Sequence, residues 1–304
     1  MAGTSAKLGS HQPSRSISLP SRLHPKSQKI EAQLNKLKTE WDLSFSSRET
    51  PIGSDTIQSG LTALTELYAS TKELIHSPLT QQALLQNHSR KTMEETLDTS
   101  IGLLDACGAA RELLLGMKEN VQSLQSALRR KVVGDSSIES NVQSYISFRK
   151  NARKEVAKSL KALKTMQKNN LFVHDQDHYH HLQPLQMVTK VLSELSTIAI
   201  SIFGAIFVFL SMPKVANGWS LISKLVPISS EKGQKIFNEV GSVDISLFSL
   251  QSQLRKNETK IDVEIVRRRL ESVDVCIDGL ESRLDCLFRC LIQHRVSLLN
   301  LLTP

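Results

Sequence analysis

The sequence predicts an all-α protein: an elongated helical bundle with a long, heptad-patterned C-terminal helix and a disordered N-terminal tail. Apolar residues recur every three or four positions along most of the 304-residue chain, and no run of alternating β-branched residues predicts a strand. Aromatic residues make up only 5%, and Gly and Pro are scarce, as in helical bundles. An apolar content of 40% is sufficient for a buried core.

Residues 1–25 differ from the rest of the chain. They are rich in Ser, Pro, Arg and His and lack apolar periodicity, so they cannot offset the entropy of ordering, and we expect a disordered basic tail. The tail has no apolar stretch typical of a secretory signal. Three of the four cysteines lie on one predicted helix, which favours reduced thiols. We therefore expect an intracellular, cytoplasmic protein.

Residues 26–170 are predicted to form the N-terminal half of the bundle. A first helix continues to about Leu43, and a second begins near Ser54 or Asp55, either of which could cap it. A long third helix spans about 91–131. A fourth spans about 137–168 and is apolar on one face, with many Lys and Arg residues on the other.

A His-rich linker, residues 171–186, separates this half from the C-terminal half, residues 187–304. The run 195–212 contains no charged residue and has two interpretations. As a transmembrane helix it has sufficient length, and residues typical of interfacial anchors flank it: Lys190, Lys214 and Trp219. As the central helix of a soluble bundle it would be covered on every face. The serine and threonine residues within it favour the buried core helix.

The C-terminal element is a long helix spanning about 258–302. Its apolar residues alternate in steps of four and three: Val266, Leu270, Val273, Ile277, Leu280, Leu284, Leu287 and Leu291. This spacing is the seam of a heptad repeat, or coiled coil. The seam widens toward the end of the helix, so we expect it to pack within its own bundle. A homodimer formed through the charged first half, near residues 267–269, is the alternative.

One short motif in the tail suggests a regulated contact. Its residues fit the pattern R-S-x-S-x-P, which 14-3-3 proteins bind when the second serine is phosphorylated: Arg15, Ser16, Ser18 and Pro20. A phosphoserine adds nearly two negative charges and three acceptor oxygens, which arginine residues on a partner bind. We predict phosphorylation-dependent docking through Ser18. An inert basic tail is the alternative.

Two groups of residues resemble metal ligands but lack a metal-site pattern. The linker contributes His174, Asp175, Asp177, His178, His180 and His181, and the last helix contributes Cys286, Cys290 and His294. The first group lies in a segment without fixed geometry, and the second lacks a fourth ligand. No G-x-S-x-G, phosphate-binding Gly-rich loop or H-E-x-x-H pattern occurs. We therefore predict no metal, no cofactor, no catalytic residues and no enzyme activity.

The formal net charge of +8 bears on possible anionic partners. Acidic residues follow the basic ones closely along most predicted helices, and aromatic residues do not alternate with basic ones as they do in single-strand binding surfaces. We therefore predict no specific nucleic-acid partner, whereas contact with an anionic membrane remains an alternative.

Four stretches of the chain carry a family resemblance: RSISLPSRLHP at 15–25, LLDACGAARELLLGMKENVQSLQSALRR at 103–130, YISFRKNARKEVAKSLKALK at 145–164, and SRLDCLFRCLIQHRVSLLNLL at 282–302. They resemble the BYPASS-like plant proteins, a plant-restricted family with a domain of unknown function. The resemblance implies an all-α fold, no assigned enzyme activity and a role in root and shoot development. We expect a non-enzymatic helical interaction protein. The alternative is a scaffold anchored at a cytoplasmic membrane face by residues 195–212.

Overall fold

Helices make up nearly all of the part of the chain that the computed structural model describes, which is residues 25–46, 51–78, 80–81, 90–130, 136–174, 183–211, 238–255 and 263–302. These residues contain no strand, so the predicted all-α fold is confirmed. The seven helices within them are α1 (Pro25–Ser46), α2 (Ser54–Ile75), α4 (Arg90–Arg130), α5 (Ser136–His174), α6 (Gln183–Leu210), α8 (Glu239–Arg255) and α9 (Val263–Leu302).

Some helix ends differ from the prediction. Helix α5 extends past the predicted end at 168 to His174, because this stretch contains neither Pro nor Gly to stop it. Helix α6 begins at Gln183 and accommodates Pro184 in its first turn, where a missing N–H costs nothing. The predicted linker 171–186 is therefore helical at both ends, and its centre lies outside the described residues.

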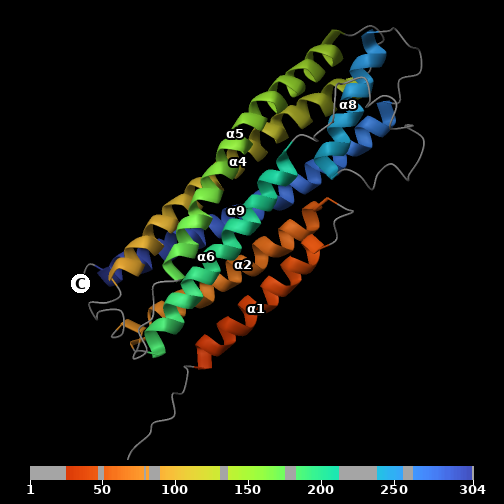
Figure 1. Cartoon of the computed structure of the whole chain (residues 1–304). Coiled ribbons are helices and arrows are strands. Elements are labelled where there is room, and N and C mark those ends of the chain that lie inside the picture. The colour runs from red at the N-terminus through yellow and green to blue at the C-terminus, as the bar shows by residue number, and fades with distance from the viewer. Residues whose placement is uncertain are drawn as a thin grey trace, which may run out of the picture.

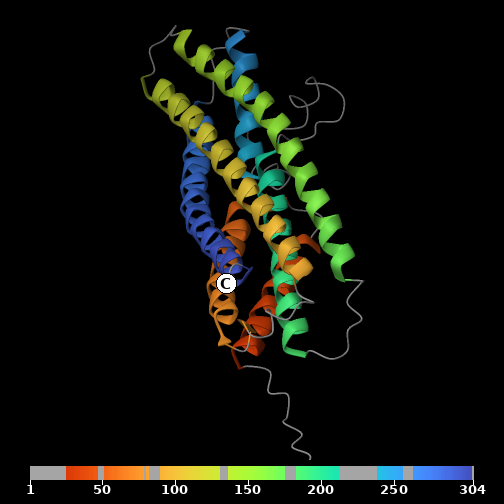
Figure 2. The same ribbon diagram turned by 90° about the vertical axis from the view of Figure 1, so that its left-hand side faces the viewer.

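The helices run roughly along one long axis and form an elongated bundle (Figures 1 and 2). Helix α9 packs against α2, α4 and α8, and α4 also packs against α5. The predicted heptad seam is buried, and each of its eight side chains is at most 5% exposed. The seam thus contacts helices of the same chain, and the alternative of a homodimer rests on the sequence alone.

Helix α6 lies at the centre of the bundle and packs against α1, α2, α4 and α5. It contains the single described stretch that is long and apolar enough to span a membrane, Val188–Leu210, and two-thirds of the most apolar window in this stretch is buried. The Trp41 indole on α1 donates a hydrogen bond to Ser201 Oγ of α6 (2.9 Å). This packing supports the interpretation of α6 as a core helix, which is apolar on all sides because neighbours cover it.

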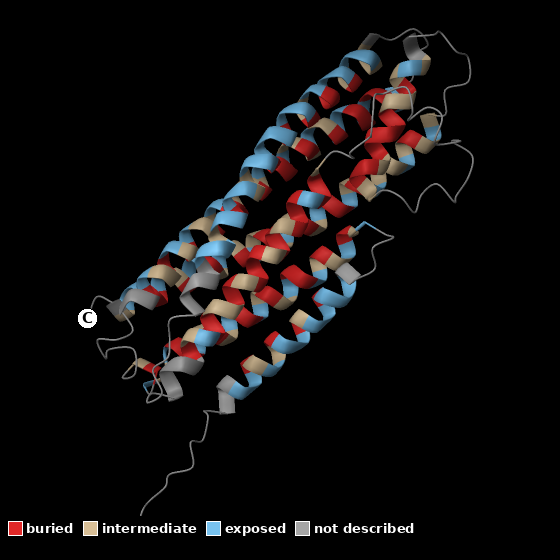
Figure 3. Ribbon diagram, viewed as in Figure 1, coloured by how far each residue is buried: buried red, intermediate tan, exposed pale blue. Residues whose placement is uncertain are grey.

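Buried side chains from both predicted halves form one hydrophobic cluster along the bundle axis (Figure 3). Close helix contacts depend on glycine at two positions. A methyl group at Gly60 would lie 2.6 Å from the Trp41 ring, and one at Gly116 would lie 2.6 Å from the Phe148 ring. The first contact brings α1 onto α2, and the second brings α5 onto α4.

Ion pairs border the seam between α4 and α9. Lys118 lies 2.8 Å from Asp278 and 2.7 Å from Glu281, and Arg111 lies 2.7 Å from Asp285. These pairs are partly exposed, so each contributes at most about 1 kcal/mol. They fix the register of α9 on α4, while the apolar seam supplies most of the stability.

The burial of the seam gives a testable expectation for stability. The Leu280 side chain is fully buried, and Leu280→Ala should lower the free energy of unfolding by about 2 to 5 kcal/mol because it leaves a cavity. Val275 on the same helix is 72% exposed, and Val275→Ala should change it by less than about 0.5 kcal/mol. Urea denaturation measures both values. Equal effects of the two substitutions would contradict the assignment of the seam.

Candidate functional site

The structure leaves the predicted tail motif and most of the His-rich linker untested. Arg15, Ser16, Ser18 and Pro20 lie outside the described residues. In the His-rich group, His174 is the last residue of α5, whereas the other five members lie outside the described residues. Both predictions therefore rest on the sequence.

The three potential ligands on α9 lie in different surroundings. The Cys286 side chain is exposed, Cys290 is half-buried, and His294 is only 4% exposed. The His294 ring packs edge-on against the Tyr68 ring of α2, with the ring centroids 5.0 Å apart. Within the described ranges, no three His, Cys, Asp or Glu side chains are grouped so that they could hold a metal ion.

The buried cysteines are poor nucleophiles. Cys107 and Cys276 are both free and buried. Burial raises the pKa of the Cys107 thiol to about 12, so this thiol stays protonated at neutral pH. Its Sγ lies 3.7 Å from the Leu284 carbonyl oxygen, a packing contact between α4 and α9.

The strongest polar feature is a buried ion pair between α5 and α8. The Arg149 guanidinium donates two hydrogen bonds to the Asp244 carboxylate, from Nε to Oδ1 (2.9 Å) and from Nη2 to Oδ2 (2.7 Å). Both side chains are only 1% exposed. Tyr145 also donates to Asp244 Oδ1 (2.8 Å), and burial together with this carboxylate raises the pKa of Tyr145 far above its ordinary value. The tyrosine hydroxyl therefore remains a donor.

Arg149 also satisfies the carboxyl end of α6. Its Nη1 donates to the Leu210 carbonyl (2.7 Å), and its Nη2 donates to the Ser211 carbonyl (3.3 Å). The amide of Asn238 donates to the Phe209 carbonyl (2.9 Å). These carbonyls have no partner within their own helix, and a cation at this end is favoured by the helix dipole. The Arg149–Asp244 pair therefore joins α5, α6 and α8.

A second polar contact joins α2, α8 and α9. Glu239 Oε1 accepts hydrogen bonds from the Ser54 N–H (3.1 Å) and the Ser54 hydroxyl (2.9 Å), and Ser54 Oγ lies 3.1 Å from Cys276 Sγ. The prediction that Ser54 or Asp55 caps α2 was wrong, because Gly53 is the N-cap and no side chain caps the helix there. A carboxylate from another helix instead meets the N-terminus of α2, where negative charge is stabilising.

Sequence reasoning missed these contacts for a clear reason. Arg149 is followed by a run of Lys and Arg residues, which indicated a solvent-facing surface. Its partner Asp244 is an isolated carboxylate on a helix far along the chain. The one local signal is that Arg149 shares a helix face with Tyr145 and Ile146, both of which are buried.

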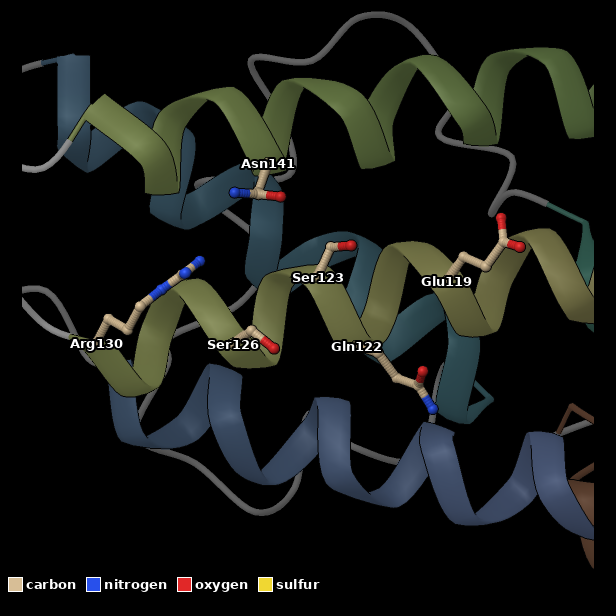
Figure 4. A pocket seen from close by; sticks show the side chains of 6 residues that line it. All are labelled: Glu119, Gln122, Ser123, Ser126, Arg130 and Asn141. Atoms are coloured by element: carbon tan, nitrogen blue, oxygen red, sulfur yellow. The ribbon is translucent and has the colours of Figure 1, made fainter.

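A shallow polar depression lies between α4 and α5 (Figure 4). Its lining residues are Glu119, Gln122, Ser123, Ser126, Arg130 and Asn141. Asn141 extends from α5 toward α4, while Gln122 points away toward α9. The depression is open to solvent and lined mainly by amide and hydroxyl groups, without the apolar walls typical of a ligand pocket.

The surface also carries an apolar stripe on α9. Ile292, Val296 and Leu299 follow one another at helical spacing and are 38–49% exposed. The guanidinium of Arg295 donates to the Leu97 carbonyl (2.6 Å) and to Ser100 Oγ (2.9 Å), which places the start of α4 beside this stripe. We refer to Ile292, Val296 and Leu299 as the α9 apolar stripe.

Loss of one partner of the buried pair should be costly. Asp244→Leu leaves a buried, unpaired guanidinium and should lower the free energy of unfolding by about 3 to 5 kcal/mol. The double variant Arg149→Met/Asp244→Leu removes both charges and should recover part of this loss, although the end of α6 then lacks its capping donor and Tyr145 lacks its acceptor. Chemical denaturation of the wild type, the two single variants Arg149→Met and Asp244→Leu, and the double variant measures the coupling. Additive losses would mean that the two side chains act independently.

The buried His294 should make stability depend on pH. Burial lowers the pKa of His294 to about 4, while an unfolded histidine titrates near pH 6.5. The unfolded chain therefore binds a proton that the folded chain excludes, and stability falls as the pH drops through this window, by up to about 3 kcal/mol.

The matched comparison is His294→Gln, which cannot titrate. The difference in unfolding free energy between the wild type and this variant should change between pH 7 and about pH 4, because the subtraction removes every contribution that both proteins share. A difference that stays constant with pH would show that His294 is accessible to protons in the folded state.

Comparison with known proteins gives one family. Residues 60–301 match the family described as Protein BPS1, and the match extends from within α2 almost to the end of α9. No curated protein and no solved structure matches the chain. Because the matched region covers well over half of the sequence, the chain belongs to the Protein BPS1 family, in agreement with the resemblance to BYPASS-like plant proteins.

Proposed function

We propose that this protein is a non-enzymatic helical interaction protein that regulates root and shoot development in plants. Membership in the Protein BPS1 family is the observation that carries the developmental role. The proposed mode of action is the binding of other proteins by a bundle whose long helices share one apolar core.

Two features support protein binding. The α9 apolar stripe exposes aliphatic side chains, and grouped apolar surface is typical of contacts with other proteins. The N-terminal tail carries the R-S-x-S-x-P motif only a few residues before α1 begins at Pro25. A partner bound at Ser18 would therefore sit close to the bundle, where it would alter access to neighbouring surfaces.

The alternative is a scaffold anchored in a membrane through residues 195–212. The length and apolar character of α6 are consistent with it, but such helices also occur as core helices of soluble proteins. The contacts of α6 with four other helices support the core role, because an anchor would have to leave them. Anchoring remains a prediction from the sequence.

Phosphorylation of Ser18 should create a 14-3-3 site. A synthetic peptide of residues 12–23 with phosphorylated Ser18 should bind a 14-3-3 protein with micromolar affinity or better, because the phosphate pairs with arginine residues of the partner. Fluorescence polarisation measures the affinity. The full-length chain phosphorylated at Ser18 should also bind, whereas the Ser18→Ala variant, which cannot carry this phosphate, should not.

Two controls test the specificity of this motif. The same peptide phosphorylated at Ser16 instead of Ser18 should bind at least about tenfold more weakly, because the phosphate is then out of register with the motif. In the full-length chain, Ser16→Ala should retain the interaction. Absence of measurable binding by the Ser18-phosphorylated peptide at micromolar concentration would refute 14-3-3 docking.

A further inference from the structure

The outer face of α5 holds most of the excess positive charge of the chain. Between residues 150 and 168, seven basic residues and one acidic residue, Glu155, give a net charge of +6, against +8 for the whole chain. The seven are Lys150, Arg153, Lys154, Lys158, Lys161, Lys164 and Lys168, and all are exposed. We refer to them as the α5 basic face.

These residues form a continuous ridge. Lys150, Lys154, Lys161 and Lys168 recur at intervals of four or seven, so they lie on one side of the helix, opposite buried residues such as Val156. The ridge extends over about 27 Å at the helical rise of about 1.5 Å per residue. Helix α5 lies at the edge of the bundle, and its outer side is exposed (Figures 1 and 3).

The ridge is poorly neutralised. Of its seven cations, only Lys158 lies within ion-pair distance of a carboxylate in the described part of the chain, that of Glu155 (3.7 Å). Both of these side chains are largely exposed, so the pair contributes little. The other charges are available to an external anion.

The neighbouring helix is acidic on its outer face. Asp98, Asp105, Glu112 and Glu119 recur every seven residues along α4, and all four are exposed. Glu119 lines the depression between α4 and α5 (Figure 4). Exposed positive and negative charges are thus separated onto adjacent helices.

We propose that the α5 basic face docks onto an anionic lipid bilayer. A flat anionic surface touches only the outermost ridge of the bundle, so it meets α5 while the acidic face of α4 stays away from it. A nucleic-acid duplex would follow its groove around the helix and bring a phosphate strand toward the α4 carboxylates. The separation of charge therefore favours a planar partner over one that wraps around α5.

The types of side chain on the ridge also favour a lipid bilayer over a nucleic acid. Six of its seven cations are lysines, whose compact charge suits diffuse attraction, whereas arginine is the usual residue for bidentate phosphate contacts. The two aromatic residues within 137–169, the part of α5 whose burial is described, are not available for base stacking, because Tyr145 is buried and Phe148 packs against Gly116. None of the large exposed apolar side chains lies within these residues of α5. Docking is therefore peripheral and sensitive to salt, and α6 remains in the core.

This inference does not depend on Ser18 or on the proposed developmental role. The test is co-sedimentation of the full-length protein with phosphatidylcholine vesicles that contain about one-fifth phosphatidylserine, at about 0.1 M salt. The protein should bind these vesicles, should not bind pure phosphatidylcholine vesicles, and should dissociate at about 0.5 M salt.

A matched pair of variants locates the surface. Lys150→Gln/Lys154→Gln/Lys161→Gln removes three charges from the ridge and should weaken binding at least about tenfold. Lys29→Gln/Lys36→Gln/Arg289→Gln removes three exposed charges from α1 and α9 and should change binding less than about twofold. All six side chains are exposed, so both variants should keep the helical circular dichroism of the wild type.

Several outcomes would overturn the proposal. One is absence of wild-type binding to phosphatidylserine vesicles, and another is equal loss of binding in the two triple variants. Binding to duplex RNA or DNA without binding to vesicles would assign the ridge to nucleic acid. Salt-sensitive self-association without vesicle binding, measured by light scattering, would instead pair the α5 basic face with the acidic face of α4 on a second copy.

Discussion

The buried pair of Arg149 and Asp244 is the contact on which the arrangement of the bundle depends. Helix α6 is apolar on nearly every face, so its carboxyl end is where the core must accommodate unpaired polar groups. The Arg149 guanidinium binds these carbonyls, and its own charge is balanced by Asp244. At the start of α8, the Asn238 side chain donates to the Phe209 carbonyl of α6, and the next residue, Glu239, accepts a hydrogen bond from Ser54, the first residue of α2. A continuous series of polar contacts thus links α5, α6, α8, α2 and, through Cys276, α9.

The sequence was sufficient for features that depend on local periodicity. The eight seam positions of α9 could be predicted because a helix with one buried face repeats its apolar residues every three or four positions. The extension of α5 to His174 was missed because polar asparagines resemble a stop, whereas only Pro or Gly would have ended the helix reliably. The Arg149–Asp244 pair could not be predicted, because the identity of a partner on a distant helix is a property of the fold.

The arrangement of charged residues on the surface also depends on the fold and could not be predicted fully from the sequence. Along most of the sequence acidic residues follow basic ones closely, and the clear exception is residues 150–168, which carry a net charge of +6. In the folded chain, the spacing of seven residues places Asp98, Asp105 and Glu112 on one side of α4, while the cations between 150 and 168 occupy the outer side of α5. Folding thus places two surfaces of opposite sign on adjacent helices, although the basic one is already visible in the sequence. Such a division orients a molecule in an electric field, which a uniform surface of the same net charge would not do.

The apolar character of α6 and the basic character of α5 therefore require separate explanations. An apolar helix at the centre of a bundle stabilises the fold, and its neighbours α1, α2, α4 and α5 are amphipathic because they must cover it. The exposed charges on the outer side of α5 contribute little to stability, since they repel one another and find few partners. An external anion would neutralise these charges, which is the contact proposed for the α5 basic face. Such contact would use α5, while the α9 apolar stripe and the tail belong to other elements, so lipid and protein partners need not compete for the same residues.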